Sequence, residues 1–307
     1  MIRKRPLRLS KYMNTVLYYI LYLILFAHAL LPLRVLYVMA DILYVLVYRI
    51  IGYRLKVVRR NLKASFPDKL NEELERSEKE FYHFFCDYIV ETIKLLHISD
   101  EEMQKRMVFE NVDLVKDLMK DGNSGLMFLG HYCNWEWVPS LNLHFRNDKC
   151  TLGEIYKPLR SKAVDRIFLK IRGRFGSVAI PKNDTLRSII TLNREGEQML
   201  VGFMADQTPS GNSIHYWTNF LNQDTPVFNG VERIAKKTGF SVTYLDMQRI
   251  KRGYYVGTIR LVSADPKSEP EDAITEKYIR MMEASILRNP ACWLWTHKRW
   301  KIRRDQA

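Results

Sequence analysis

A short stretch in the middle of the chain, residues 125–137, most constrains what this sequence can fold into. Residues 126–129 form an apolar run between two glycines, which is typical of a short buried strand. Gly130 follows the run and allows a sharp turn because it has no Cβ to clash. The stretch therefore predicts a buried strand that ends in a tight turn, with His131 standing at the turn.

A helix is expected directly after this turn. Asn134 is a suitable N-cap for a helix over residues 135–145, which Pro139 would kink. If both were helical, His131 and Glu136 would point about 140° apart, because five steps turn a helix by roughly 500°. With His131 in the turn, the Glu136 carboxylate can reach the imidazole, fix its tautomer and make it a general base. A hydrogen-bonded structural histidine would show the same pattern, so the residues alone leave both interpretations open.

Strands and helices alternate along the rest of the chain. The patterns predict strands at 150–156, 198–204, 240–247 and 254–262, and helices at 71–96, 100–120, 161–171, 186–195, 228–238 and 271–288. Such alternation indicates an α/β layered domain with a mainly parallel or mixed sheet. A chain of 307 residues can bury a large core, and we place this domain at residues 56–307.

Residues 1–55 have a different character and are expected to form a hydrophobic helical hairpin that attaches the protein to a membrane. The uncharged run from Met13 to Leu33 is long enough to cross a bilayer, and no cleavage site of a signal peptide follows it. The stretch from Val35 to Ile51 contains two charges and is expected to lie in the interface or re-enter one leaflet. A buried hairpin of a soluble domain is the alternative. Basic residues flank both sides, which is compatible with two cytoplasmic ends; those before the run are Arg3, Lys4, Arg5, Arg8 and Lys11.

The formal charge of +14 predicts acidic partners: nucleic acid, an anionic membrane surface, or an acidic carrier protein. No nucleic-acid-binding motif is recognisable, so nucleic acid is not expected. The four cysteines are scattered without a Cys-x-x-Cys pair, which favours reduced thiols and gives no metal site. The sequence has no nucleotide-binding glycine loop either, and we expect no cofactor.

The central motif carries a resemblance. Gly130-His131-x-x-x-x-Glu136 resembles the His-x4-Asp/Glu motif of the lysophospholipid acyltransferase superfamily, and Gly-His-x-x-Asn-Trp-Glu is similar to its lipid A biosynthesis late acyltransferase (lauroyl/myristoyl acyltransferase) branch. The similarity extends from the N-terminal apolar segment to residues 295–301. It implies a glycerolipid-acyltransferase-like fold. It also implies an enzyme of the inner, cytoplasmic membrane, with its catalytic domain on the cytoplasmic side.

The resemblance also implies a reaction. A fatty acyl chain would move from a thioester donor, acyl carrier protein or acyl-CoA, to a hydroxyl of a phosphorylated lipid acceptor, a lipid A precursor. His131 would be the general base and Glu136 would orient it. Arg172 and Arg174 fall in a block that would bind the acceptor's phosphate, for which the planar guanidinium is well suited. Two solvated arginines at a helix C-terminus are the alternative.

Asp206 follows the predicted strand at 198–204 and resembles a third block of the family, which we assign to substrate binding. A strand-end aspartate that faces the first motif can orient the substrate or a basic residue, and it can also cap the turn at 208–211. Glu91, within the predicted helix 71–96, is expected to be a surface carboxylate, and a buried functional acid is the alternative.

Three other functions remain open from the sequence. A lysophospholipid or aminolipid acyltransferase would use the same site. A thioesterase would use Cys133 as a nucleophile, and a non-catalytic lipid-binding protein would keep the fold without turnover. The intact pair of His131 and Glu136 argues against the last.

Overall fold

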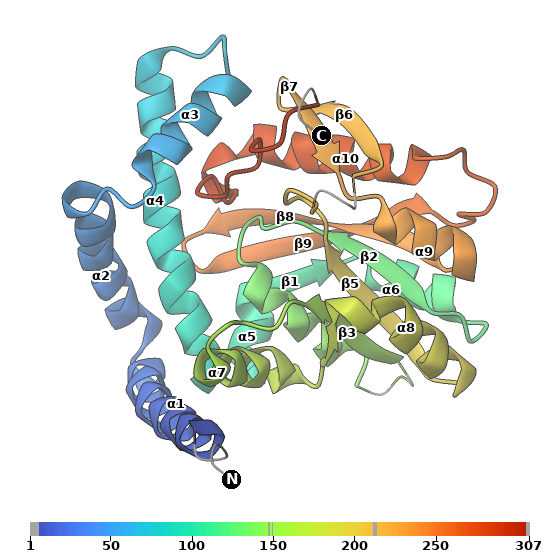
Figure 1. Ribbon diagram of the computed structural model, residues 1–307, viewed down its shortest axis with the longest axis horizontal. Helices are drawn as coiled ribbons and strands as arrows, with labels where there is room; N and C mark the ends of the chain where they lie inside the picture. The colour runs from blue at the N-terminus through green and yellow to red at the C-terminus, as the bar shows by residue number, and fades with distance from the viewer. Residues whose placement is uncertain (1–5, 147, 149, 211–213, 305–307) are drawn as a thin grey trace.

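The computed structural model describes residues 6–146, 148, 150–210 and 214–304, and it is built around a seven-stranded sheet (Figure 1). The strand order is β1 (Met107–Glu110), β9 (Tyr254–Ser263), β8 (Ser241–Lys251), β2 (Gly125–Leu129), β5 (Gln198–Met204), β3 (Cys150–Tyr156) and β4 (Val178–Pro181). All neighbours pair in parallel except β8 and β9, which form an antiparallel hairpin. The predicted α/β class with a mainly parallel sheet is therefore confirmed. The basic residues at 3–5 and Gly211 lie outside the described residues.

Strand β2 lies at the centre of the sheet, between β8 and β5, and all five of its residues are buried. Leu129 at the end of β2 pairs with Met204 at the end of β5. Because the two strands are parallel, their carboxyl ends meet at the same edge of the sheet. The chain passes from β2 to His131 and from β5 to Asp206, so the register alone brings these two residues together.

Helices cover both faces of the sheet, with α10 (Ala273–Arg288) above it and α7 (Lys162–Arg172) below it in the view of Figure 1. The other helices described after β2 are η3 (Trp135–His144), η4 (Gly173–Phe175), η5 (Lys182–Asp184), α8 (Thr185–Arg194), α9 (Gly230–Thr238) and η7 (Pro290–Cys292). A separate hairpin comprises β6 (Tyr216–Phe220) and β7 (Gln223–Val227).

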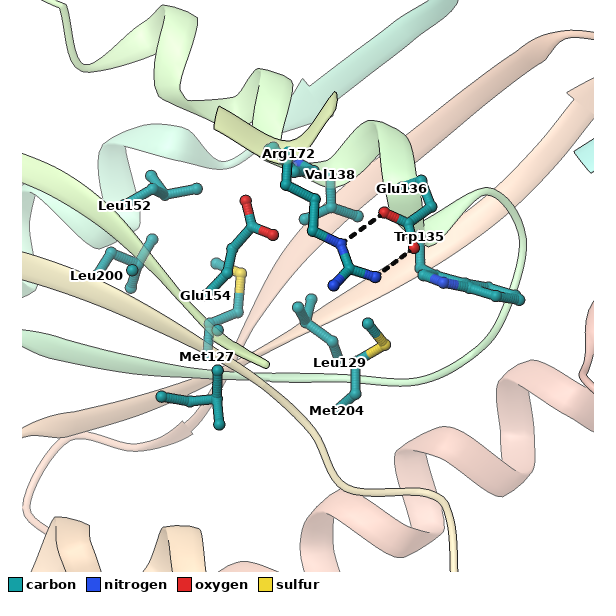
Figure 2. A pocket seen from close by; sticks show the side chains of 14 residues that line it. Met127, Leu129, Trp135, Glu136, Val138, Leu152, Glu154, Arg172, Leu200 and Met204 are labelled. Carbon is teal, nitrogen blue, oxygen red and sulfur yellow. Dashed lines mark hydrogen bonds and ion pairs between the residues drawn. The ribbon is translucent and has the colours of Figure 1, made fainter. Parts of the chain in front are cut away.

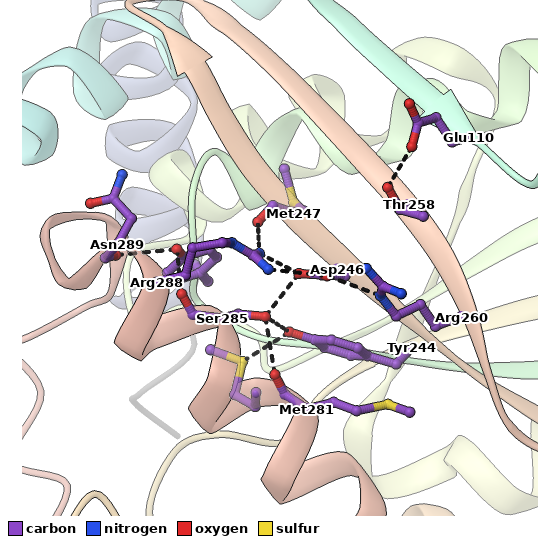
Figure 3. A network of polar contacts seen from close by, with 12 residues as sticks. Glu110, Tyr244, Asp246, Met247, Thr258, Arg260, Met281, Ser285, Arg288 and Asn289 are labelled. Carbon is purple, nitrogen blue, oxygen red and sulfur yellow. Dashed lines mark hydrogen bonds and ion pairs between the residues drawn. The ribbon is translucent and has the colours of Figure 1, made fainter.

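A buried polar network fixes α10 to the sheet (Figure 3). Asp246 on β8 accepts a hydrogen bond from the Ser285 hydroxyl at 2.9 Å and pairs with Arg288 at 2.5 Å. Arg260 on β9 donates to the same carboxylate at 3.0 Å. The carboxylate is nearly inaccessible and thus has a partner on each side, which a buried charge requires.

The predicted helix at 100–120 is wrong, because this segment forms α5 (Asp100–Arg106), strand β1 and α6 (Val112–Met119). Side chains in β1 alternate between buried and exposed, and the strand pairs with β9 at the edge of the sheet. Asn111 adopts a positive φ of 59°, which separates the strand from α6.

The N-terminal helices differ from the expected hairpin. They are α1 (Pro6–Leu30), α2 (Leu33–Tyr44), η1 (Val45–Ile50), α3 (Leu55–Ser65), α4 (Asn71–Lys94) and η2 (Leu95–His97). Figure 1 shows α2 leading on from α1 along α4 instead of folding back on α1. Lys94 of α4 stabilises the bend by donating to the carbonyls of Ala29 and Leu31 at 2.7 and 2.9 Å. Both helices pack on α4, so neither needs the other as a partner.

Within the described residues, the helical segment Met13–Leu30 is long and apolar enough to cross a membrane by itself, and the pair Leu33–Ile50 and Leu55–Ser65, bent by 87°, would qualify as a broken span or re-entrant loop. The segment Met13–Leu30 has a mean hydropathy of 1.6, and 11% of it is buried.

The chain after α10, residues 289–300, forms what we call the C-terminal strap, and α3 holds it in place. The side-chain amide of Asn61 donates to the carbonyls of Trp295 and His297, each at 2.9 Å. Arg54 donates to the carbonyl of Thr296 at 2.9 Å. Segments more than 230 residues apart in sequence are thereby joined beside the carboxyl edge of the sheet.

Candidate active site

His131 follows β2, and its imidazole contacts the aspartate that follows β5. His131 Nδ1 lies 2.7 Å from Asp206 Oδ1, and Asp206 Oδ2 accepts the backbone N–H of His131 at 3.0 Å. The indole N–H of Trp293, in the C-terminal strap, donates to the same Oδ2 at 2.9 Å. Burial raises the pKa of Asp206, but the contacts with His131 and Trp293 outweigh it and hold the pKa at about 2. The carboxylate is therefore ionised at neutral pH and accepts three hydrogen bonds.

These contacts define the tautomer of the imidazole. Because ionised Asp206 can only accept, Nδ1 of His131 carries a proton, and in the neutral imidazole Nε2 therefore carries the lone pair. The side-chain amide of Gln207 lies 3.1 Å from Nε2 and donates to it. Nε2 is thus the atom that can take up a proton, and the histidine side chain is 18% exposed.

Glu136 does not orient His131, so this prediction is wrong. Its carboxylate forms a bidentate pair with Arg172, at 2.9 Å from Nε and 2.6 Å from Nη2 (Figure 2). The loop turns sharply at Cys133, where φ is 52°, before entering the 3-10 helix η3. Asp206, which sequence reasoning grouped with the substrate, occupies Nδ1 instead. Of its predicted roles, the orientation of a basic residue matches the observed contacts.

Glu154 is a second carboxylate near Arg172 that sequence reasoning missed. It lies on β3, accepts the hydroxyl of Ser177 at 2.6 Å and faces Arg172 in Figure 2. Burial raises its pKa to about 7, with Ser177 and Arg172 opposing the shift. The signal was present in the sequence, since Glu154 is the only charged residue in the strand Cys150–Tyr156.

An apolar cavity with a free volume of about 40 Å³ lies beside these groups, over the ends of β2, β5 and β3 (Figure 2). Leu129 and Trp135, which flank His131 in sequence, contribute to its wall. Its floor and sides are otherwise formed by Met127, Val138, Pro139, Leu152, Gly153, Ile155, Leu200, Gly202 and Met204, and its polar groups are Glu136, Glu154 and Arg172. Flexible methionines in the wall allow the cavity to adapt to an inserted chain.

The two arginines predicted to bind phosphate both have partners in the protein. Arg172 is held by Glu136, and the pKa of its guanidinium is raised because this pairing outweighs the effect of burial. Arg174 donates to the carbonyl of Ile98 and lies 3.7 Å from Asp100, with 30% of its side chain exposed. Phosphate binding by either residue stays a prediction.

Cys133 is completely buried, and burial raises the pKa of its thiol far above the usual value. A nucleophilic cysteine must be accessible and easily deprotonated, so the structure argues against the thioesterase alternative. No group of three or more His, Cys, Asp or Glu side chains suited to a metal occurs in the ranges that the structure describes.

Glu91 was expected at the surface, and this expectation is also wrong, because the side chain is completely buried. Asn134 was predicted as a helix cap, but its side chain makes no capping bond and instead donates to Glu91 at 2.7 Å. The apolar periodicity that predicted α4 does not show which polar residues of the helix are buried.

Comparison with known proteins gives a consistent result. Residues 2–302 match the family model described as bacterial lipid A biosynthesis acyltransferase. The lipid A biosynthesis palmitoleoyltransferase of Escherichia coli (strain K12) is 23% identical over 253 residues, covering 81% of this chain and 79% of that protein. A lipid A biosynthesis acyltransferase of Haemophilus influenzae is 23% identical over 257 residues, covering 82% of this chain and 79% of the relative.

Proposed function

Because the chain belongs to the bacterial lipid A biosynthesis acyltransferase family, we propose that this acyltransferase moves a fatty acyl group from a thioester donor to a hydroxyl of a phosphorylated lipid A precursor. The observation that carries the proposal is the environment of His131. Its Nδ1 is bound by Asp206, its Nε2 accepts from the Gln207 amide, which the substrate hydroxyl would displace, and its ring packs against Trp135 in the wall of an apolar cavity. A base next to an apolar chain-binding cavity fits acyl transfer to a hydroxyl.

In the proposed reaction, Nε2 of His131 removes the proton from the acceptor hydroxyl as its oxygen attacks the thioester carbonyl. Asp206 stabilises the imidazolium that forms, as in other histidine–carboxylate pairs. The tetrahedral intermediate then collapses, the carbon–sulfur bond breaks, and the thiolate takes the proton from the imidazolium. The products are the acylated lipid and the free thiol of the donor, and no covalent acyl-enzyme forms.

The first carbons of the donor's acyl chain are proposed to lie in the apolar cavity, and because its free volume is about 40 Å³, the wall, which includes Leu129, Leu152 and Met204, must open to admit the rest of the chain. The ion pair of Glu136 and Arg172 closes the polar side of that cavity. Acyl carrier protein is the proposed donor, because its acidic surface complements the charge of +14, and acyl-CoA is the alternative.

The acceptor's phosphate is proposed to bind at Arg172 and Arg174, where it would join or replace the present partners. An Arg174→Lys variant tests this role, since lysine keeps the charge but loses the planar fork. The apparent KM for a phosphorylated acceptor should rise about 10- to 100-fold. With a dephosphorylated acceptor the apparent KM should stay unchanged. An equal rise in KM with both acceptors would show that Arg174 does not bind the phosphate.

Attachment to the inner membrane through residues 1–55, with the catalytic domain at 56–307 on the cytoplasmic side, completes the proposal. The apolar and largely exposed segment Met13–Leu30 supports it.

The decisive experiment is acyl transfer by purified protein to a lipid A precursor, with an acyl carrier protein donor, compared with the His131→Ala variant. Loss of a general base costs about 10²–10⁴-fold in rate, while the variant should fold normally because the side chain is not part of the core. Wild-type turnover by folded His131→Ala would refute the mechanism. Transfer to a lysophospholipid in preference to lipid A would favour the alternative acceptor.

A further inference from the structure

Glu91 lies in α4 and is completely inaccessible to solvent, yet it is surrounded by hydrogen-bond donors instead of a counter-ion in direct contact. Its Oε2 accepts from the amide of Asn134 at 2.7 Å and from the hydroxyl of Tyr255 at 2.8 Å. Its Oε1 accepts from the hydroxyl of Tyr37 at 2.9 Å. All three groups donate to the carboxylate, so both of its oxygens are occupied.

Two of the contacts made by Glu91 hold the loop that follows the catalytic histidine. Asn134 lies three residues after His131, and the indole N–H of Trp137 donates to the backbone carbonyl of Glu91 at 3.1 Å. Between these two anchors lies Glu136, the partner of Arg172. The loop is therefore attached to α4 at both ends of the short segment that closes the cavity.

The third contact reaches the N-terminal apolar region. Tyr37 is in α2, which runs along α4 at the side of the molecule (Figure 1). One carboxylate thus joins α2, the strand β9 through Tyr255, and the loop after β2. Asp87, one turn earlier on α4, is equally buried but binds Arg249 and Arg252 and does not contact the loop.

We propose that Glu91 is a positioning residue of the acyl-transfer site, which sets the loop carrying His131 and Glu136 and ties it to α2. This inference rests on the proposed function, because its kinetic test measures acyl transfer. Glu91 touches neither His131 nor the cavity, so its side chain acts on the loop through Asn134, while the contact of Trp137 with the backbone carbonyl is kept in every variant. A base displaced by about 1 Å loses roughly 100-fold in rate, so the effect should appear in kcat.

The test exchanges the carboxylate of Glu91 and the amide of Asn134, which are hydrogen-bonded to each other. At pH 8, Glu91→Leu leaves three donors without an acceptor, and Asn134→Asp puts two carboxylates together; each should lower kcat about 100-fold with less than a threefold change in KM. The double variant Glu91→Gln/Asn134→Asp restores an amide facing a carboxylate and should recover kcat to within about tenfold of wild type. Asp87→Asn is the matched control, and it should lower thermal stability but leave kcat within about threefold.

A second measurement does not depend on activity. Hydrogen exchange of the amides at 131–138 should be faster in Glu91→Leu than in wild type, and near wild type in the exchanged double variant. If the wild-type protein transfers no acyl group, the proposed function fails, and the exchange data alone decide on Glu91. Normal kcat in folded Glu91→Leu, no recovery in the double variant, or unchanged exchange at 131–138 would overturn the inference.

Discussion

At the scale of single residues, the site follows from which carboxylate can reach the histidine. Asp206 follows the neighbouring parallel strand, and its carboxylate contacts the imidazole of His131. Glu136 lies beyond a turn and pairs with Arg172 instead. Spacing along the sequence suggested the nearer residue, but in a parallel sheet the closest neighbours of a strand end belong to the adjacent strands.

The surroundings of Asp206 predict a specific effect of Asp206→Asn. Its Oδ2 accepts two N–H groups, from Trp293 and from the backbone of His131. An asparagine must keep its oxygen there, so its NH₂ group faces Nδ1, and the imidazole proton moves to Nε2. The base is then blocked, and kcat should fall about 10²–10⁴-fold.

The measurement is the single-turnover rate of acyl transfer. Trp293→Phe is the companion variant. It should lower the single-turnover rate only about tenfold, because Asp206 loses one hydrogen-bond donor but still holds the proton on Nδ1 of His131. A rate for Asp206→Asn close to that of wild type would show that Asp206 does not set the tautomer.

At the scale of elements, the sequence patterns identified the strands that carry the site. The ranges 150–156 and 198–204 match β3 and β5 residue for residue, because both have apolar runs bounded by clear breaks. Strands β1 and β4 were missed, since each has only four residues and lies at a sheet edge, where pairing with a distant strand outweighs local preference.

The candidate site was predictable only in part, for the same reason. His131 and Asp206 follow strands with strong patterns, so their position could be inferred. Glu91 and Glu154 could not be assigned, because their roles depend on contacts with residues 43 and 23 positions away. Periodicity reveals which face of an element is apolar, but it does not show which polar side chains are buried within it.

The cavity formed by the ends of β2, β5 and β3 predicts a change in chain selectivity. Leu152 of β3 is buried in its wall, so Leu152→Trp should fill the space and favour acyl donors several carbons shorter. Mass spectrometry of products from a mixture of donors measures the shift. Leu261→Trp, on the exposed side of β9, should leave the distribution unchanged. An unaltered distribution in folded Leu152→Trp would place the acyl chain elsewhere.

At the scale of the whole molecule, α1 and α2 present exposed apolar side chains along one side. These include Val16, Leu17, Ile20, Leu23, Ile24, Val35, Val38 and Ile42. A patch of this size is unusual on a soluble monomer and fits a lipid surface. The opposite face of α1 packs on α7, where Arg166 and Lys170 lie over the rings of Tyr18 and Tyr22 at 4.0 and 4.2 Å.

The exposed patch predicts that a double variant, Leu23→Glu/Ile42→Glu, binds membranes less well. Both side chains are more than 60% exposed, so the fold should tolerate the change, while two charges in the lipid face should weaken binding on the order of 100-fold. Flotation with liposomes containing anionic lipid measures the effect. Leu287→Glu, an exposed site on α10, is the control. Equal flotation of the double variant and wild type would rule out this face as the attachment surface.

The attachment of α3 to the C-terminal strap has a consequence for biosynthesis. Asn61 is synthesised more than 230 residues before its partners, the carbonyls of Trp295 and His297. Trp293, which completes the environment of Asp206, belongs to the same late segment. We therefore expect the nascent chain to stay catalytically silent until residues 289–300 have been synthesised, because closing so long a loop must wait for its second end. The acyltransferase site is then complete only after α1, α2 and α3 have already been made.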